Sequence, residues 1–369
     1  MRTVRRLFYA DIVSSVAFVA LAFLSLFFFI DFVDEIGNIG ARGTTILNAA
    51  AYSLLLVPAH FYELIPIAVL IGAIYALARL AQTSQYTILR TGGLGPWRAL
   101  WLLTSLGLLF ALLTYVVGDY VAPRSERYAS ELQATRKGGI KLGQSGAWLK
   151  DHANTPEGER GYSVSIGSAE GGALLHDVRI FEFDADGRLL RRIAAARAHV
   201  GSDSAWTLRD VRITRWIEGG AAAPRAPEQE FAEVVWPSTL SAAVVAAAVL
   251  PASTMSTVDL YRYIGHLANN EQAAQSQQIQ FWKRAFYPFA CLVMMGLALP
   301  FAYLSARTGG VSLKVFGGIM LGISFVLLNN VAGHLGLLRN WTPWIVSLAP
   351  SALYMLLSFV AFSWLVRYR

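Results

Sequence analysis

Cysteine is nearly absent from this sequence, in which Cys291 is the single thiol among 369 residues. One thiol cannot form an intramolecular disulfide, and the six histidines show no spacing typical of a metal site. The nucleotide-binding patterns GxxxxGKS and GxxxxGKT are missing, as are GxSxG and HExxH. We therefore expect no P-loop ATPase activity and no catalytic site in this chain, and no cofactor bound to it.

Charge is also scarce, because only 15% of the residues are charged while 55% are hydrophobic. The mean hydropathy of +0.46 lies above that of ordinary soluble domains. Apolar runs long enough to cross about 30 Å of hydrocarbon recur along the chain. They predict a mainly α-helical membrane protein with transmembrane helices near residues 12–30, 54–78, 99–118, 286–304, 311–332 and 343–366.

The basic residues predict the orientation of these helices. They gather in both terminal tails and in the connections after the second and fourth helices, whereas the other short connections are acidic or nearly neutral. Positive loops stay cytoplasmic, so we expect both termini and the segment 79–93 in the cytoplasm. The net charge of +7 is spread over short loops and forms no nucleic-acid-binding patch. The basic residues are Arg2, Arg5, Arg6, Arg79, Arg90, Arg98, Arg307, Lys314, Arg367 and Arg369.

The chain between the third and fourth helices has an ordinary soluble composition. Four segments, "YSVSI", "LHDVRIFEFD", "RLLRRIAAARAHV" and "WTLRDVRITRWI", are typical of β-strands, and Asp186-Gly187 predicts a hairpin turn. We expect an antiparallel sandwich or open barrel over 119–254. A connecting helix follows over 255–282, with Leu260, Ile264 and Leu267 on one face. The membrane helices then occupy 1–118 and 283–369.

Polar residues within the apolar runs are the candidate site residues. Glu63 lies between Pro58 and Pro66, and an ionisable group in a membrane span is a functional candidate. The alternative, which we favour, is a solvated position at the membrane interface, and Asp31 allows the same two interpretations. Asn329 is suited either to hydrogen bonds between helices or to lining a cavity.

The segment "RLAQTSQYTILRTGG", residues 79–93, separates the second and third helices and carries no acidic side chain. Leu80, Ser84 and Thr87 or Ile88 fall on one helical stripe, and Gly92-Gly93 is a stop signal. Such a helix lies on anionic headgroups or docks on a soluble partner, and the residues alone leave both interpretations open.

Several motifs, taken in order, resemble the LptF/LptG (YjgP/YjgQ) family of lipopolysaccharide-export permeases. They are "FVDEIGNIG", "LLLVPAHFYELIPIAVLIGAIYALARLAQTS", "DYVAPRSE", "GAWLKD", "TVDLYRYIGHL" and "QFWKRAFYPFACLVMMGLALPFAYL". The resemblance covers essentially the whole chain. The segments "GAWLKD" and "FVDEI" are closer to the LptG branch than to the LptF branch.

The resemblance implies a permease subunit of an ATP-driven transporter in the bacterial inner membrane. Such a subunit pairs with an LptF-like second permease and with an LptB-like ATPase dimer, which binds the ATP and Mg. It extracts lipopolysaccharide and passes it to LptC-like and LptA-like bridge proteins in the periplasm. The segment 119–254 would be a periplasmic β-jellyroll, and the segment 79–93 would be the coupling helix that docks on the ATPase.

The resemblance also implies two sets of site residues. Gln85 stands where the family commonly has Glu, which puts an ion pair with the ATPase in doubt. The docking residues would be Leu80, Ser84, Gln85, Tyr86, Ile88, Leu89 and Arg90. The substrate cavity, formed by the first, second and fifth helices, would include Phe27, Phe28, Asp31, Glu63, Leu64, Phe325 and Asn329.

Two other functions compete with export. The first is a membrane-anchored periplasmic assembly or receptor protein, whose helices only hold the β domain. The second is an ion-coupled secondary transporter that uses Glu63. A coupling helix without a P-loop in the same chain favours export over the receptor. A single intramembrane carboxylate without a charged partner argues against the ion-coupled transporter.

Overall fold

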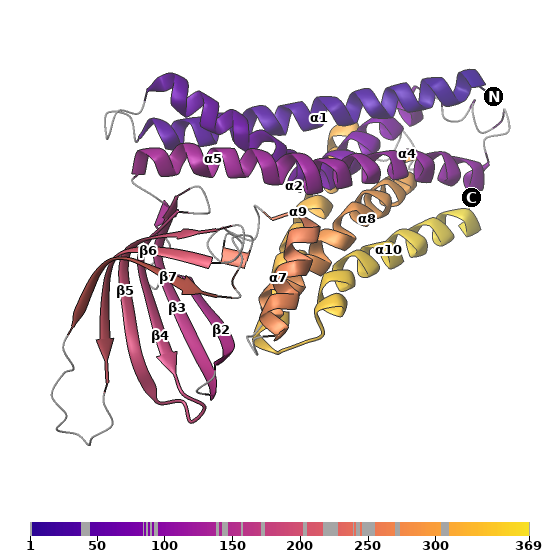
Figure 1. Ribbon diagram of the computed structural model, residues 1–369. Helices are drawn as coiled ribbons and strands as arrows, with labels where there is room; N and C mark the ends of the chain where they lie inside the picture. The colour runs from indigo at the N-terminus through magenta and orange to yellow at the C-terminus, as the bar shows by residue number, and fades with distance from the viewer. Residues whose placement is uncertain are drawn as a thin grey trace. The chain divides into compact units, whose positions relative to one another are not determined.

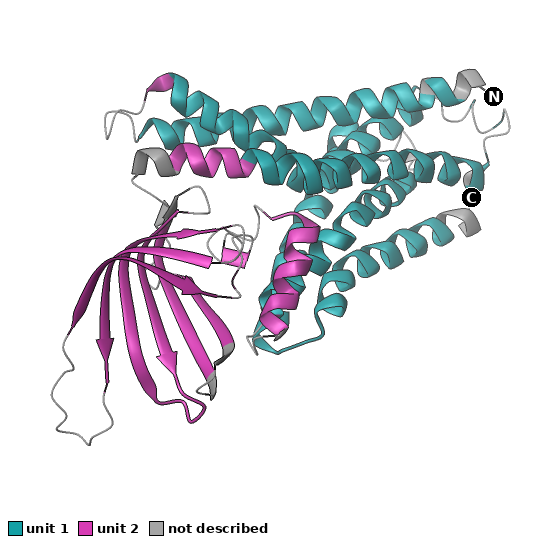
Figure 2. Cartoon of the chain, in the orientation of Figure 1, with its two compact units in different colours: residues 1–38, 47–125, 275–369 teal, residues 39–46, 126–274 magenta. Residues whose placement is uncertain are grey.

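The computed structural model describes residues 2–37, 45–83, 85, 88, 91, 95–137, 140–141, 147–155, 158–170, 174–201, 205–216, 228–238, 240, 244–245, 255–269, 274–303 and 310–368. The chain divides into two compact units (Figure 2). The helical unit comprises residues 1–38, 47–125 and 275–369, and the sheet unit comprises residues 39–46 and 126–274.

Within the residues that the structure describes, six helices are long and apolar enough to cross a membrane, in agreement with the predicted number. The helical unit contains α1 (Arg2–Ile36), α2 (Ile46–Gln82), α4 (Pro96–Val116), α8 (Gln275–Tyr303), α9 (Val311–Leu338) and α10 (Pro343–Tyr368). Both chain termini lie at the same end of this unit, which we call the termini side, and we call the other end the far side (Figure 1).

Proline and glycine fix several of these helix ends. Proline is the first residue of both α4 and α10, where its missing N–H would have no partner within the helix. Gly95 and Gly310 precede α4 and α9 in an extended conformation. Helices α9 and α10 begin at the predicted residues, 311 and 343, and α4 begins three residues before its predicted start at 99.

Helix α2 is the centre of the helical unit, and 78% of its most apolar stretch is buried. Its neighbours approach closely at glycines. A Cβ on Gly72 would lie 2.6 Å from the backbone of Val16 in α1. On α9, Cβ atoms on Gly318 and Gly322 would lie 2.6 and 2.9 Å from side-chain atoms of Ile74 and Ile67. The pair at 318 and 322 is a GxxxG motif, which lets membrane helices pack closely.

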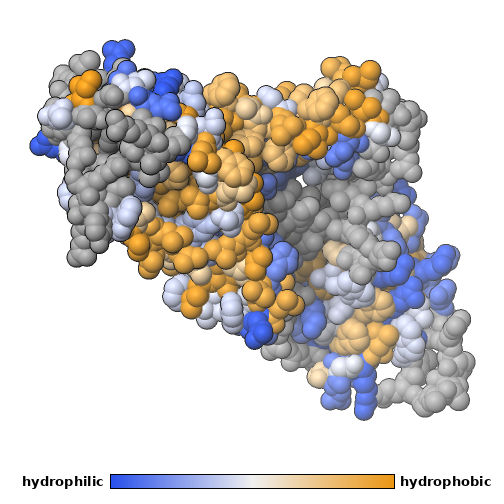
Figure 3. All heavy atoms as spheres, turned by 180° about the vertical axis from the view of Figure 1, so that it is seen from behind, coloured by the Kyte–Doolittle hydropathy of each residue, from blue (hydrophilic) through white to orange (hydrophobic). Residues whose placement is uncertain are grey.

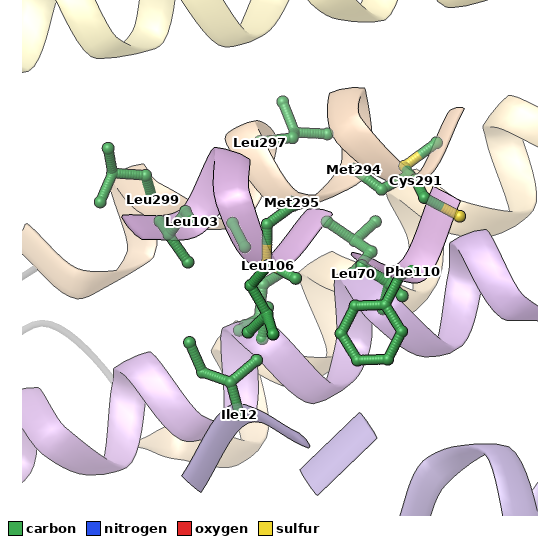
Figure 4. Close-up of a cluster of buried hydrophobic side chains, with 14 of the residues drawn as sticks. Ile12, Leu70, Leu103, Leu106, Phe110, Cys291, Met294, Met295, Leu297 and Leu299 are labelled. Atoms are coloured by element: carbon green, nitrogen blue, oxygen red, sulfur yellow. The ribbon is translucent and has the colours of Figure 1, made fainter. Parts of the chain in front are cut away.

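The core of the helical unit joins α1, α2, α4 and α8 (Figure 4). Gly107 in α4 faces Leu292 and Met295 in α8. Two methionines of α8 with flexible side chains, Met294 and Met295, fill the space between these helices. The labelled residues of this core are Ile12, Leu70, Leu103, Leu106, Phe110, Cys291, Met294, Met295, Leu297 and Leu299.

Helix α4 does not end where the apolar run ends. It continues through a π-helical turn, η1 (Val117–Val121), into α5 (Ala122–Lys137). The π-turn accommodates Pro123, which has no N–H to donate, and the N–H of Ala122 bonds back to the carbonyl oxygen of Val117. The predicted start of the β domain at residue 119 is therefore wrong, because residues 119–137 are helical. The main segment of the sheet unit begins at Glu126.

The sheet unit holds seven antiparallel strands in one sheet. They are β1 (Ile140–Lys141), β2 (Ala147–Thr155), β3 (Gly158–Glu170), β4 (Leu174–Phe183), β5 (Leu189–Val200), β6 (Ala205–Arg215) and β7 (Gln229–Pro237). The order is β1-β3-β4-β5-β6-β7, and β2 also pairs with β3. The predicted hairpin turn between β4 and β5 is confirmed, with Gly187 at φ +77° and Asp184 Oδ1 accepting from the N–H groups of Asp186 and Arg188.

The sheet curls around its own core. Tyr162 in β3 and Trp236 in β7 lie on strands separated by three others, yet their ring centroids are 5.5 Å apart. One row of positions across β3 to β7 is missing from the paired ladders, although the register is the same on both sides of the row. These positions are Gly167, Asp177, Ala196, Asp210 and Ala232. Asp177 and Asp210 adopt φ of 50° and 56° in this row. Aspartate tolerates this left-handed region better than most residues, which allows the ladders to be interrupted at this row.

The predicted connecting helix over 255–282 is two helices. Its first part, α7 (Thr257–Asn269), belongs to the sheet unit, and α8 begins at Gln275. Ser256 and Asp259 form a reciprocal cap at the start of α7, and Arg127 of α5 donates to the same carboxylate at 2.6 Å. Burial raises the pKa of Asp259, but these hydrogen bonds outweigh burial and hold it below its usual value. As predicted, Leu260 and Leu267 are buried on one face.

Candidate functional site

The rest of the chain covers little of helix α1, because only 11% of its most apolar stretch is buried. Its buried stripe, Phe8, Ile12, Val16 and Ala20, lies in the termini-side half. Most of the remaining surface is exposed and apolar, and it includes Phe18, Leu21, Leu26 and Phe29. Apolar side chains also cover wide areas of the helices in Figure 3. A helix of this kind faces lipid, a partner protein or an apolar ligand.

An ion pair at one end and a histidine–aspartate hydrogen bond at the other hold α1 to α2. At the termini side, Arg79 donates to Asp11 at 2.8 Å. The charge of Arg79, which the sequence assigned to the segment 79–93, is thus paired within the helical unit. On the far side, His60 Nε2 lies 2.7 Å from Asp31 Oδ2, and the ring of Phe27 lies 4.9 Å from the imidazole. Asp31 is therefore half-buried in a specific pair and is not simply solvated at the interface.

Three of the predicted cavity residues lie along the far-side half of α1. Phe27 and Asp31 meet at His60, whereas Phe28 stacks on Phe32 of the same helix with a centroid distance of 6.1 Å. All three side chains are half-buried, so part of each remains open to a partner or ligand.

Glu63 and Leu64 stand at the edge of the buried half of α2, which begins at Ile65. The side chain of Glu63 is exposed and that of Leu64 is half-buried. The backbone oxygen of Glu63 accepts a hydrogen bond from Tyr287 of α8 at 2.5 Å. Glu63 is thus next to the polar residues that join α2 to α8.

Glu63 is not the only carboxylate in this part of the span. Asp119 is buried in the π-turn η1, and Asp119, Glu63 and Arg284 are all close enough to act electrostatically on Tyr62. The Tyr62 and Tyr287 ring centroids are 4.7 Å apart. The premise that this part of the spans holds a single carboxylate is therefore wrong. The sequence analysis missed Asp119 because it assigned this residue to the soluble domain.

The two predicted cavity residues on α9 differ in burial. Phe325 is only 2% exposed and packs edge-to-face on Tyr354 of α10. It belongs to the core and offers almost no open surface in this chain, and its role as a cavity or gate residue stays a prediction. Asn329, one turn further, remains half-buried. Only 22% of the most apolar stretch of α9 is buried, which leaves Leu327 and Val331 exposed next to Asn329.

The predicted docking residues fall partly on α2 and partly beyond it. Leu80 is 1% exposed in the helical core, so its assignment to a docking surface is wrong. Gln85 and Ile88 are helical and exposed, and Ile88 is 67% exposed. A bulky apolar side chain so exposed on a polar segment is suited to contact with a partner. Ser84, Tyr86, Leu89 and Arg90 lie outside the described residues.

His60 and the GxxxG motif on α9 were missed by sequence reasoning. The motif was available as a known pattern for close helix packing. His60 gave no signal by itself, because its partner Asp31 is on another helix. The available clue was that Asp31 and His60 can carry opposite charges and lie near the ends of two consecutive spans joined by a short connection.

We expect Asp31→Asn to loosen the far-side half of α1. A hydrogen bond to a charged group typically contributes about 1.5–3 kcal/mol and a neutral one about 0.5–1.5 kcal/mol. Apart from Glu35, which is buried, the side chains of residues 21–37 on this half of α1 are exposed or half-buried, so the weaker bond should let it separate from α2. Spin labels on Phe29→Cys and Leu54→Cys, in a Cys291→Ala background, should then give a broader distance distribution. Asp34→Asn, on an exposed neighbour, is the control, and an unchanged distribution in both Asp31→Asn and His60→Phe would contradict the expectation.

Comparison with known proteins bears on the whole chain. The sequence pattern described as lipopolysaccharide export system permease LptF/LptG matches residues 6–365. The chain is 28% identical over 339 residues to LptG of Escherichia coli strains K12 and CFT073, covering 91% of this chain and 91% of each relative. It is 25% identical over 331 residues to LptG of Haemophilus influenzae, covering 89% of both chains. Such coverage includes both units, and the chain therefore belongs to the LptF/LptG family of lipopolysaccharide export permeases.

Proposed function

We propose that this chain is the permease subunit of an ATP-driven lipopolysaccharide exporter and that it works beside a second, LptF-like permease. The observation that carries the proposal is that the rest of the chain buries only 11% of the most apolar stretch of α1. The chain also matches the family over residues 6–365. An apolar helix held mainly by one buried stripe, one ion pair and one histidine–aspartate hydrogen bond is suited to a cavity shared between two permeases. Family membership favours this function over the receptor and over the ion-coupled transporter.

The substrate would lie along the far-side parts of α1 and α9. Apolar residues on these helices, such as Phe29 and Leu327, would contact its acyl chains. Phe27, Phe28, Asp31 and Asn329 would line the same surface in part. Because α2 is largely buried between Ile65 and Leu80, we expect it to contribute mainly its far-side residues, including Glu63 and Leu64.

Lys283 on α8 is a cation suited to the anionic groups of the substrate. Its ammonium lies only 2.5 Å from the position that a Cβ on Gly333 of α9 would occupy, so the glycine makes room for the charge. Among the residues that the structure describes, Lys283 has no ion pair. We propose that Lys283 contacts a phosphate of the lipopolysaccharide from the α8–α9 side.

ATP hydrolysis would take place in a separate, LptB-like ATPase dimer, because this chain has no P-loop. The exposed Ile88 and Gln85 would dock on that ATPase, with both termini on the same, cytoplasmic side of the inner membrane. The curled sheet would be a periplasmic jellyroll that passes lipopolysaccharide to LptC-like and LptA-like bridge proteins. The distribution of arginine residues supports this orientation.

Purification of the tagged full-length chain from its native membrane tests the proposal. We expect an ATPase and a second multi-span permease in the complex, together with ATP hydrolysis. Chain stripped of the ATPase should hydrolyse no ATP. An unrelated tagged membrane protein of similar size is the control. Turnover that persists in the isolated chain, or recovery of the chain without any ATPase, would contradict the proposal.

A further inference from the structure

A cavity of about 320 Å³ lies between α4, α8 and α10 in the helical unit. None of its lining residues within the described part of the chain belongs to α1, α2 or α9, so it is separate from the surface proposed for lipopolysaccharide. Only Thr104 and Ser358 bring hydroxyl groups to its wall, and every other lining side chain is apolar. The lining residues are Leu100, Thr104, Phe289, Leu292, Val293, Gly296, Met355, Ser358, Phe359 and Phe362.

The cavity opens toward the surroundings of the helices. Phe289, Met355 and Phe359 line it and also keep large exposed surfaces. Gly296 contributes no side chain to the wall, and a Cβ at this position would lie 3.1 Å from Ser358 Oγ of α10. In a membrane, an opening of this kind on a span admits hydrocarbon and excludes water.

The cavity occupies the termini-side half of the spans. Leu100 and Thr104 lie in the first turns of α4, and Phe362 lies in the last turns of α10. Trp97, which is largely exposed, contacts Phe362 edge-to-face with a centroid distance of 5.6 Å. Exposed Arg98 follows it. Tryptophan is typical of the membrane–water interface, and arginine beside it attracts anionic headgroups.

We propose that this cavity binds one acyl chain of an anionic phospholipid from the leaflet on the termini side. An apolar cavity of about 150 Å³ holds one benzene, so this cavity holds roughly a dozen carbon atoms of an acyl chain. An empty cavity of this size would forfeit the dispersion contacts of its walls. The headgroup would lie next to Trp97 and Arg98, where a phosphate meets positive charge.

A photoreactive phospholipid tests the site in the full-length chain, purified in its complex and reconstituted in nanodiscs. The probe is a phosphatidylglycerol with a diazirine in the middle of one acyl chain. After illumination, mass spectrometry should locate the label within Phe289–Gly296 and Met355–Phe362. Thr104→Phe fills the cavity and should remove this labelling. Leu112→Phe adds the same ring to a lipid-exposed position of α4 and should keep it.

Three outcomes would overturn the proposal. The first is labelling that survives both Thr104→Phe and a second filling variant, Ser358→Leu, which serves if the first variant folds poorly. The second is labelling spread evenly over every lipid-exposed helix. The third is equal labelling by a phosphatidylcholine probe, which would show that the site does not select an anionic headgroup. Arg98→Gln should lower labelling by the anionic probe alone.

Discussion

Gly72→Ala should destabilise the helical unit severely, although alanine is the better helix former. A Cβ at this position would lie 2.6 Å from the backbone nitrogen and Cα of Val16. Backbone atoms cannot rotate away as a flexible side chain does, so α1 would have to shift along its whole buried stripe. Overpacking typically costs about 1–3 kcal/mol and more where backbone must move. We expect a marked fall in the thermal unfolding temperature in detergent and loss of α1 packing.

Gly317→Ala is the matched control for this prediction. Gly317 lies in the interior of α9, and a Cβ there would meet Phe301 at 3.9 Å, an ordinary contact. Replacing glycine by alanine in a helix gains about 1 kcal/mol of helix propensity, so this variant should be as stable as the parent or more so. If Gly72→Ala unfolds at the same temperature as Gly317→Ala, the close contact between α1 and α2 is not present in the membrane.

Ile88→Asp should abolish or strongly weaken association with the ATPase while leaving the helical unit intact. Ile88 is 67% exposed within this chain, so an aspartate there costs its own fold little. In a docking interface the same carboxylate would be buried without a partner, which typically costs several kcal/mol. About 1.4 kcal/mol already changes affinity tenfold. Co-purification of the ATPase and ATP turnover by the complex should therefore both fall.

Three other variants make this result specific to docking. Gln82→Asp places the same charge on an exposed residue at the end of α2 and should leave the complex intact. Gln85→Ala removes a neutral hydrogen bond worth about 0.5–1.5 kcal/mol and should do less than Ile88→Asp. Gln85→Glu should be tolerated, since it restores the residue that the family commonly carries. Unchanged ATPase recovery with Ile88→Asp would mean that this segment lies on lipid headgroups.

The segments that sequence alone located correctly are those governed by local chemistry. Apolar runs of sufficient length predicted every membrane helix, because a span must bury each backbone polar group within its own hydrogen bonds. Asp186-Gly187 predicted a hairpin turn, because the turn needs a positive φ at Gly187. The start of the sheet unit was missed because the π-turn carries the helix past Pro123, a residue that ordinarily marks a helix boundary.

Burial of individual residues within the spans was decided by the tertiary structure alone. In a membrane span, positions facing lipid and positions facing the core are both apolar, so a sequence pattern does not separate them. The sequence pattern therefore placed Leu80 and Phe325 among the candidate site residues, although both side chains are buried. Asp31 and His60 are 29 positions apart in the chain and meet only because α1 and α2 pack side by side. The sequence determined which segments cross the membrane, and packing around α2 determined which of their side chains remain open to a substrate or partner.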